Sequence, residues 1–315
     1  MRTALVALLL AAQTSSPIFR FETEGFWLNL HHYLYVLGRV EAKMPDINRR
    51  AVARAPIDQA EGLKSVSEAE RQAWNESVAF YARGLSRLNA IFDGELIAAT
   101  NMLRRVQENT SPSKLKLDPA VAAALSRAAP IYLKVWWPRH QEANRARVRE
   151  YTRLVDDHGP EVLAYLTRVY QEPWPKDGFP VNLSGYANWA GAYSTRGQLL
   201  VVSSLDEGTA GSLGLESIFH EAMHQWDDAI YARLSRLQKQ HQTPPVREDL
   251  THALIWYTVA EAVKSVIPAH RGYAEVGGMW NQKGLGSFKP ALDLHWKPYL
   301  DGKGTLDDAL LAILR

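Results

Sequence analysis

The chain has 315 residues, with 36 Lys and Arg against 34 Asp and Glu, so its formal net charge is only +2. This length allows one or two domains with a sizeable core, and the balanced charge argues against a nucleic-acid-binding or membrane-surface protein. The chain contains no Cys, which excludes disulfides, thiolate metal ligands and a Cys nucleophile.

The first sixteen residues have the pattern of a secretory signal peptide. Arg2 is positively charged, residues 4–12 are apolar, and residues 13–16 are polar or small. This order is typical of an export signal, and nine apolar residues are too few to span a bilayer. We therefore predict a cleaved signal peptide over residues 1–16. We predict an exported, periplasmic or extracellular bacterial protein without a membrane span, because an exported chain lacking disulfides fits those compartments. A frayed apolar N-terminus is the alternative.

Residues 17–171 are predicted to form a helical region. Ser67 and Glu70 have the spacing of a capping box, which marks the start of a helix. The first predicted helix contains His31 and His32, and neighbouring residues on a helix point about 100° apart. We therefore predict packing or hydrogen bonding for this pair, with a role in a substrate cleft as the alternative. The expected helical segments are 21–40, 67–88, 96–106, 121–135, 139–155 and 160–170, with a loop and a short helix, or a pro-segment, over 44–64.

The composition changes after a proline-containing linker at residues 172–178, and three strands are expected at 179–183, 189–193 and 198–203. The run Leu199–Val202 is continuously apolar, which is typical of a strand buried on both faces. The predicted fold is therefore mainly α (α+β), with the helical region packed on a second half, residues 172–315, that carries a small sheet. A single α domain with a strand insertion is the alternative.

The stretch that carries chemistry is His220-Glu221-Ala222-Met223-His224. Side chains four residues apart lie on one face of a helix, so both imidazoles can reach one ion. Zinc binds imidazole nitrogen and leaves a position for water when three side chains hold it. Glu221 can then act as general base. Two ordinary His and a solvated Glu are the alternative, although a buried helix tolerates such groups poorly without a partner. Apolar residues at helical spacing indicate burial of this helix: Leu215, Ile218, Phe219, Ala222 and Met223. The helix is expected to continue to about Lys239.

Two His leave zinc one protein ligand short. One pattern places a third His six residues after the second, but that position is Ile230. A Gly-Thr-x-x-Asp pattern at residues 304–308 is explained equally well as a helix start. We predict Glu261, on an expected helix Leu250–Val266, as the third ligand, because its flanking residues are apolar and a carboxylate there needs a partner. Pairing of Glu261 with Lys264 or Arg271, and His252 as the ligand instead, are the alternatives.

Four side chains near that helix are candidates for donating a hydrogen bond to a developing oxyanion. Tyr257 lies one turn before Glu261 and shares its face. His252 begins the same helix, and His270 and Tyr273 follow its end. We predict Tyr257 and His252 as catalytic residues beside Glu221, with the other two kept as candidates.

A motif helix that follows a strand and precedes a Glu-bearing helix resembles the gluzincin branch of the zincin metallopeptidases, over about residues 198–266. The resemblance implies Zn²⁺, a peptide or protein substrate, and substrate pairing along 197–203 or 191–193. It leaves the subfamily and the substrate open, because the Glu stands in Ala-Glu-Ala-Val. We predict an exported zinc metallopeptidase. A non-peptidase or inactive metal-binding relative acting as a binding module, and a structural protein with an accidental motif, are the alternatives.

Overall fold

A computed structural model describes residues 17–46, 49–195, 199–281 and 284–315, so the predicted signal peptide lies outside the described residues. The described chain is 67% helix and 7% strand, which confirms the mainly α prediction. Among these residues no helix combines the length and apolarity that a membrane crossing requires.

Four strands form one mixed sheet: β1 (Phe19–Glu22), β2 (Phe179–Ser184), β3 (Ala192–Thr195) and β4 (Leu199–Ser203). Their order is β1-β2-β4-β3, in which β1, β2 and β4 are parallel and β3 runs antiparallel to β4. The sequence predicted β2, β3 and β4 with shifted ends, but missed β1. Strand β4 is central, so residues 199–203 have no free edge for a substrate.

Fourteen helices surround the sheet within the described ranges: α1 (Phe26–Glu41), α2 (Arg50–Ala53), α3 (Ala55–Gly62), α4 (Glu68–Arg83), α5 (Gly94–Leu103), α6 (Pro119–Val135), α7 (Trp137–Tyr170), α8 (Gly211–Met223), α9 (Asp227–His241), α10 (Leu250–Val266), α11 (Tyr273–Val276), α12 (Lys289–Ala291), α13 (Lys297–Leu300) and α14 (Leu306–Leu314). Several predicted helix ends differ by up to five residues, and two differences are larger. Helix α7 continues through Pro160, where we expected a turn. The motif helix ends at Met223, and a 3₁₀ turn, His224–Trp226, separates it from α9.

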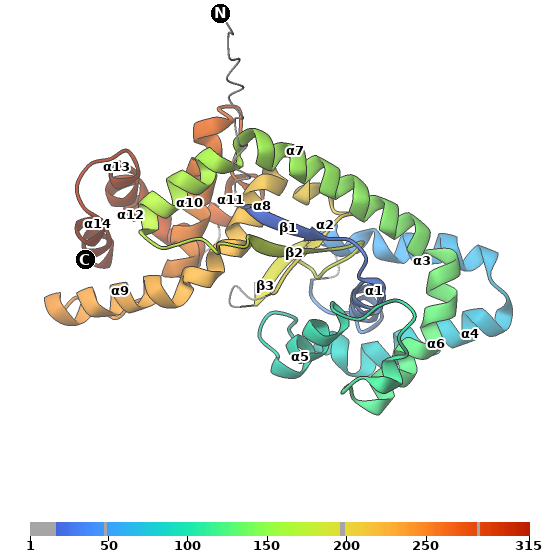
Figure 1. The fold of residues 1–315 in the computed structure, drawn as a ribbon. Helices are drawn as coiled ribbons and strands as arrows, with labels where there is room; N and C mark the ends of the chain where they lie inside the picture. The colour runs from blue at the N-terminus through green and yellow to red at the C-terminus, as the bar shows by residue number, and fades with distance from the viewer. Residues whose placement is uncertain (1–16, 47–48, 196–198, 282–283) are drawn as a thin grey trace, which may run out of the picture.

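The two faces of the sheet belong to two different hydrophobic cores. Leu200 and Val202 point to a core that includes α7, α8 and α10. Leu199 and Val201 point to a core that includes α1, α4 and α6. Figure 1 shows these two groups of helices on opposite sides of the strands. Successive residues from Leu199 to Val202 enter alternate cores, which is why this run is continuously apolar, as the sequence indicated.

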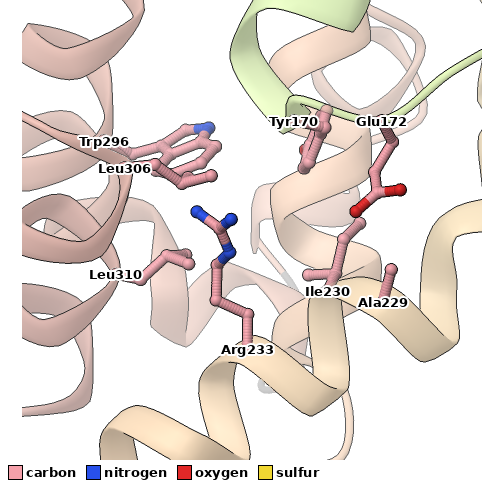
Figure 2. A pocket seen from close by; sticks show the side chains of 8 residues that line it. All are labelled: Tyr170, Glu172, Ala229, Ile230, Arg233, Trp296, Leu306 and Leu310. Atoms are coloured by element: carbon pink, nitrogen blue, oxygen red, sulfur yellow. The ribbon is translucent and has the colours of Figure 1, made fainter.

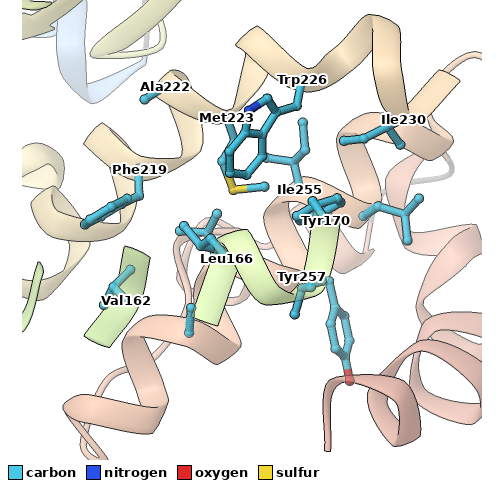
Figure 3. Packing of buried hydrophobic residues seen from close by; sticks show 14 of the residues in the cluster. Val162, Leu166, Tyr170, Phe219, Ala222, Met223, Trp226, Ile230, Ile255 and Tyr257 are labelled. Atoms are coloured by element: carbon cyan, nitrogen blue, oxygen red, sulfur yellow. The ribbon is translucent and has the colours of Figure 1, made fainter. Parts of the chain in front are cut away.

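The predicted division at residue 171 does not separate these cores. Strand β1 comes from the N-terminal part and pairs with β2. Helix α7, also from that part, contributes Val162, Leu166 and Tyr170 to the core that contains the motif helix. Figure 3 shows these side chains beside Phe219 and Met223 of α8 and Ile255 of α10. The motif helix is therefore held by residues from both predicted parts.

Candidate metal centre

Three histidines converge between α8 and α10. Ligand-capable atoms of His220, His224 and His252 all lie within 4.8 Å of one another. The Nε2 atoms of His220 and His252 are 3.2 Å apart. In the described part of the chain, no other group of three His, Asp or Glu side chains converges in this way. Three imidazoles around one point are a donor set that zinc accepts while keeping a position for water.

The buried face of α8 places His220, and the 3₁₀ turn that directly follows α8 places His224. Leu215, Ile218, Phe219, Ala222 and Met223 are all completely buried, as their helical spacing predicted. These residues pack α8 against α7 and the sheet, and α10 crosses the same helix. The third histidine comes from the first turn of α10. The cluster therefore depends on the packing of two helices that are 26 residues apart in the chain.

The structure places His252, and not Glu261, as the third member of the cluster. The two residues are nine positions apart on α10, which at about 100° per residue puts them on opposite sides of the helix. The Glu261 side chain is 22% exposed, and its carboxylate lies 3.4 Å from Lys297 Nζ and 4.0 Å from Lys264 Nζ. The prediction of Glu261 as a ligand is thus corrected, since solvent and lysines supply the partners that we assigned to a metal.

Tyr257 is also engaged away from the cluster. Its hydroxyl donates to Asp293 Oδ1 at 2.8 Å, and Lys289 Nζ lies 5.3 Å from the centre of its ring. Five residues separate it from His252, or about 140° around the helix. The structure therefore does not support Tyr257 as a catalytic residue.

Asp227 orients the second motif histidine. Its Oδ2 lies 2.8 Å from His224 Nδ1, which fixes the ring and leaves Nε2 for a metal, the arrangement common around metal-binding histidines. Burial lowers the pKa of His224, but Asp227 and Glu221 outweigh it, and the net shift is upward. The sequence analysis missed Asp227, although its spacing of three residues from His224 indicates a shared helical face.

Burial keeps the other two imidazoles neutral at pH 7. It lowers the pKa of His220 well below its usual range, and the neighbouring histidines act in the same direction. It also lowers the pKa of His252 to about 4, again with His224 contributing. Neutral imidazole is the form that binds a metal, so these two positions are prepared for one. The donor set therefore fits zinc.

Glu221 follows His220 on α8, the helix that packs against strand β3. Burial raises the pKa of its carboxyl group, while His224 and polar groups of Ser194 act in the opposite direction. A carboxylate with raised proton affinity beside a metal site can take a proton from water.

Two aromatic rings extend from the cluster. Trp256 stacks on His220, with ring centres 3.5 Å apart and planes 23° apart. Tyr273 stacks in turn on Trp256, at 5.2 Å and 16°. The sequence analysis did not single out Trp256, although it lies one helical turn after His252. The rings of His220, Trp256 and Tyr273 thus form one stacked series.

The remaining sequence candidates have structural partners. His31 and His32 are both buried, with His31 Nδ1 2.9 Å from the Tyr81 hydroxyl and His32 Nε2 2.8 Å from the Tyr193 hydroxyl. The predicted packing and hydrogen-bonding role is therefore confirmed. Thr305 caps α14, and Asp307 pairs with arginines of α9, which confirms the helix-start interpretation of that segment.

A small pocket also lies away from the histidines. The residues that line it, none of them in the histidine cluster, are Tyr170, Glu172, Ala229, Ile230, Arg233, Trp296, Leu306 and Leu310. Figure 2 shows the Arg233 side chain among these mainly apolar neighbours. We assign no chemistry to it.

Comparison of the chain with protein-family models, with curated proteins and with solved structures finds no match in any of the three.

Proposed function

We propose that this chain is an exported zinc metallopeptidase, with the ion held by His220, His224 and His252. The observation that carries the proposal is the convergence of these imidazoles within 4.8 Å, with Glu221 next to the first in the chain. The third ligand distinguishes this site from the gluzincin pattern, in which a Glu follows on a later helix. The resemblance is thus limited to the motif helix and its neighbours.

Each residue of the site has a chemical task in this proposal. Zinc bound to the three imidazoles would polarise the scissile carbonyl and lower the pKa of water to about 7. Glu221 accepts the proton of the attacking water and passes it to the leaving amine. Asp227 holds the His224 ring in the orientation that exposes Nε2. Trp256 covers His220 and excludes water from that side of the cluster.

Metal content tests the ligand assignment directly. His252→Ala and Glu261→Ala change two residues of the same helix, and only the first should lose zinc. We expect about one zinc per chain in the wild type and in Glu261→Ala, measured by atomic emission after gel filtration. Loss of zinc from Glu261→Ala and retention in His252→Ala would reject the three-histidine centre in favour of the gluzincin pattern.

Cleavage of a quenched fluorescent peptide library tests the activity. Glu221→Gln should keep zinc and lower the rate by about 100-fold or more, because it removes the base and retains the shape. A wild type that binds zinc but cleaves no peptide would favour the alternative, a metal-binding relative that acts as a binding module. Export is tested separately, by N-terminal sequencing of protein from the periplasm of a bacterial host, where cleavage near residue 16 is expected.

A further inference from the structure

A serine, a histidine and a glutamate form a continuous hydrogen-bonded series apart from the metal centre. Ser212 Oγ lies 2.9 Å from His270 Nδ1, and His270 Nε2 lies 2.9 Å from Glu216 Oε2. The side chains of His270 and Glu216 are completely buried, whereas Ser212 is partly exposed. A hydroxyl, an imidazole and a carboxyl group in this order can activate a serine nucleophile, and such a series is recognised by its geometry and not by the order of its residues in the chain.

The hydrogen bonds indicate which ring nitrogen of His270 carries the proton. The backbone N–H of Tyr273 donates to Glu216 Oε2 at 2.7 Å, so this oxygen is an acceptor. His270 therefore donates to it from Nε2, and Nδ1 is left with a free electron pair that accepts from the Ser212 hydroxyl. The ring is thus oriented as a base towards Ser212. Its two nitrogens have exchanged the parts that they play in the well-known Ser-His-Asp triad.

Ser212 lies in the first turn of α8, where backbone N–H groups have no partner inside the helix. The N–H of Gly211 donates to Glu150 Oε1 at 2.6 Å. In the part of the chain that the structure describes, the N–H groups of Ser212 and Leu213 donate to no acceptor. A Cβ added to Gly211 would meet no atom of another segment within 4 Å, so there is open space beside the serine. Two free N–H groups beside a nucleophile can stabilise an oxyanion.

This series and the metal centre lie at opposite ends of the same helix. Ser212 is in the first turn of α8 and His220 is in its last turn. Eight residues separate them, or about 12 Å along the helix axis. The three histidines of the metal centre do not belong to the series. Chemistry at Ser212 therefore needs no metal ion, and it can be measured separately from chemistry at the cluster.

We propose that Ser212 is the nucleophile of a second catalytic site, that His270 is its base, and that Glu216 is the residue that positions His270. The site hydrolyses esters of small carboxylic acids. A partly exposed serine holds a small substrate only weakly, and an ester suits such a site because an alcohol leaves more readily than an amine. This activity does not depend on the proposed peptidase function.

The reaction has two steps, which form and then hydrolyse an acyl group on Ser212. Ser212 Oγ adds to the ester carbonyl carbon, its proton passes to His270 Nδ1, and the carbonyl π electrons move to the oxygen. These electrons return as the C–O bond breaks, and the departing alcohol takes the proton from His270. Water then adds to the acyl carbon while His270 takes a proton from it. The Ser212 oxygen leaves with that proton, and the carboxylic acid is released.

Ser212→Cys tests whether His270 acts as a base at this position. The chain contains no Cys, so this variant has a single thiol, whose unperturbed pKa would be about 8.5. The pH dependence of its alkylation by iodoacetamide should show a thiol pKa lower by about one unit or more, because an imidazole beside a thiol favours the thiolate. Adding His270→Gln keeps the helix start and should return the pKa towards about 8.5.

The same measurement tests Glu216 as a positioning residue. Glu216→Gln removes the charge that favours a protonated His270, so in the Ser212→Cys background the alkylation profile should move to higher pH. Adding Glu216→Gln where His270→Gln is already present should move it no further, since residues that act as a unit are not additive. Circular dichroism checks that each variant is folded.

The natural serine is tested in the full chain with a chelator present, so that bound metal does not contribute. A fluorophosphonate probe should form an Oγ–P bond with Ser212 as fluoride leaves, which mass spectrometry of peptides locates. Ser212→Ala should abolish this labelling and lower 4-nitrophenyl acetate hydrolysis to the uncatalysed rate. His270→Gln should lower the hydrolysis by about 100-fold or more. Ser217→Ala is the matched control, because Ser217 lies on the same helix and its hydroxyl donates to the Leu213 carbonyl.

The outcomes distinguish the parts of this inference. Labelling of Ser212 that requires His270 supports it, and labelling that persists in Ser212→Ala, or none in the wild type, overturns the nucleophile. A thiol pKa that does not respond to His270→Gln overturns the base, and a profile that does not respond to Glu216→Gln overturns the positioning role. A wild type without zinc or peptide cleavage overturns the proposed function and leaves the role of Ser212 standing.

Discussion

The buried pair His31 and His32 should make the folded chain sensitive to acid. Both side chains are hydrogen-bonded inside the core between α1 and its neighbours. Burial lowers the pKa of His31 to about 3, and the charge of His32 acts in the same direction. Burial lowers the pKa of His32 to about 4, against a hydrogen bond to Leu28. An unfolded His has a pKa of about 6.5. Between this value and the lower folded pKa values, the unfolded chain therefore binds more protons than the folded chain.

The sign and the size of the effect follow from this difference. The stability from each neutral imidazole is fully present above about pH 6.5, and it is lost as pH falls towards the folded pKa. The slope is about 1.4 kcal/mol per pH unit for each group. An unfolded His is already half protonated at pH 6.5, so from pH 6.5 to pH 5 each histidine should lower the free energy of unfolding by about 1.5 kcal/mol, and the pair by about 3 kcal/mol. This is a large part of the roughly 5–15 kcal/mol typical of a folded domain.

Urea unfolding of wild type and His31→Gln, followed by circular dichroism from pH 7 to pH 4.5, measures this slope. Gln does not titrate and can keep one hydrogen bond to Tyr81. As pH falls, the free energy of unfolding should decrease less steeply in the variant than in the wild type, by about 1.4 kcal/mol per pH unit. His241→Gln, at the exposed end of α9, is the control and should keep the wild-type slope. A chelator in all samples removes metal competition at the cluster. Parallel curves for wild type and His31→Gln would refute the reasoning.

Three further changes test the site and its supports. Asp227→Asn should weaken zinc binding by about 10- to 100-fold, because it removes the charge that orients His224. Competition with a chromophoric chelator measures the affinity, and an unchanged affinity would contradict this role of Asp227. Gly191→Ala should lower the free energy of unfolding by about 1–3 kcal/mol. Gly191 has a positive φ, and an added Cβ would collide with Asp206 Oδ2. A melting temperature equal to that of the wild type would contradict this prediction. Ser67→Ala should cost about 1 kcal/mol by removing a helix cap, whereas Ser65→Ala, outside the cap, is the control that should cost less in the same urea titration.

The motif helix was predictable because its signal is local. Apolar spacing fixed the buried face of α8, and the same spacing put His220 and His224 on one side. Ser67 was predictable for the same reason, and its side chain accepts from the N–H of Glu70 as the capping box requires. Strand β1 had a local signal too, since Phe19-Arg20-Phe21-Glu22 alternates. We began the neighbouring helix at residue 21, which assigned the second half of β1 to that helix.

The third ligand was not predictable, because α10 is apolar almost all around. Its buried residues include an unbroken run from Ala253 to Val259. A helix buried on most sides gives no preferred face, so the spacing could not decide whether His252 or Glu261 meets α8. The packing decides it, through contacts with α7 and α8 that join distant parts of the chain. The sequence also predicted a turn before Pro160, where α7 in fact continues. A proline leaves the carbonyl four residues earlier without its helical hydrogen bond. Residues 156 and 160 are exposed, so water can bond to that carbonyl and the helix is not interrupted.

The order of the strands limits how an extended peptide could reach the cluster. Strand β4 is paired on both sides, with β2 and with β3. Strand β3 is paired on one side only and is antiparallel to the rest. A peptide that adds to a sheet needs such a one-sided strand, but all four residues of β3 are buried. Neither of the two segments that the resemblance suggested is therefore open to an added strand in this structure.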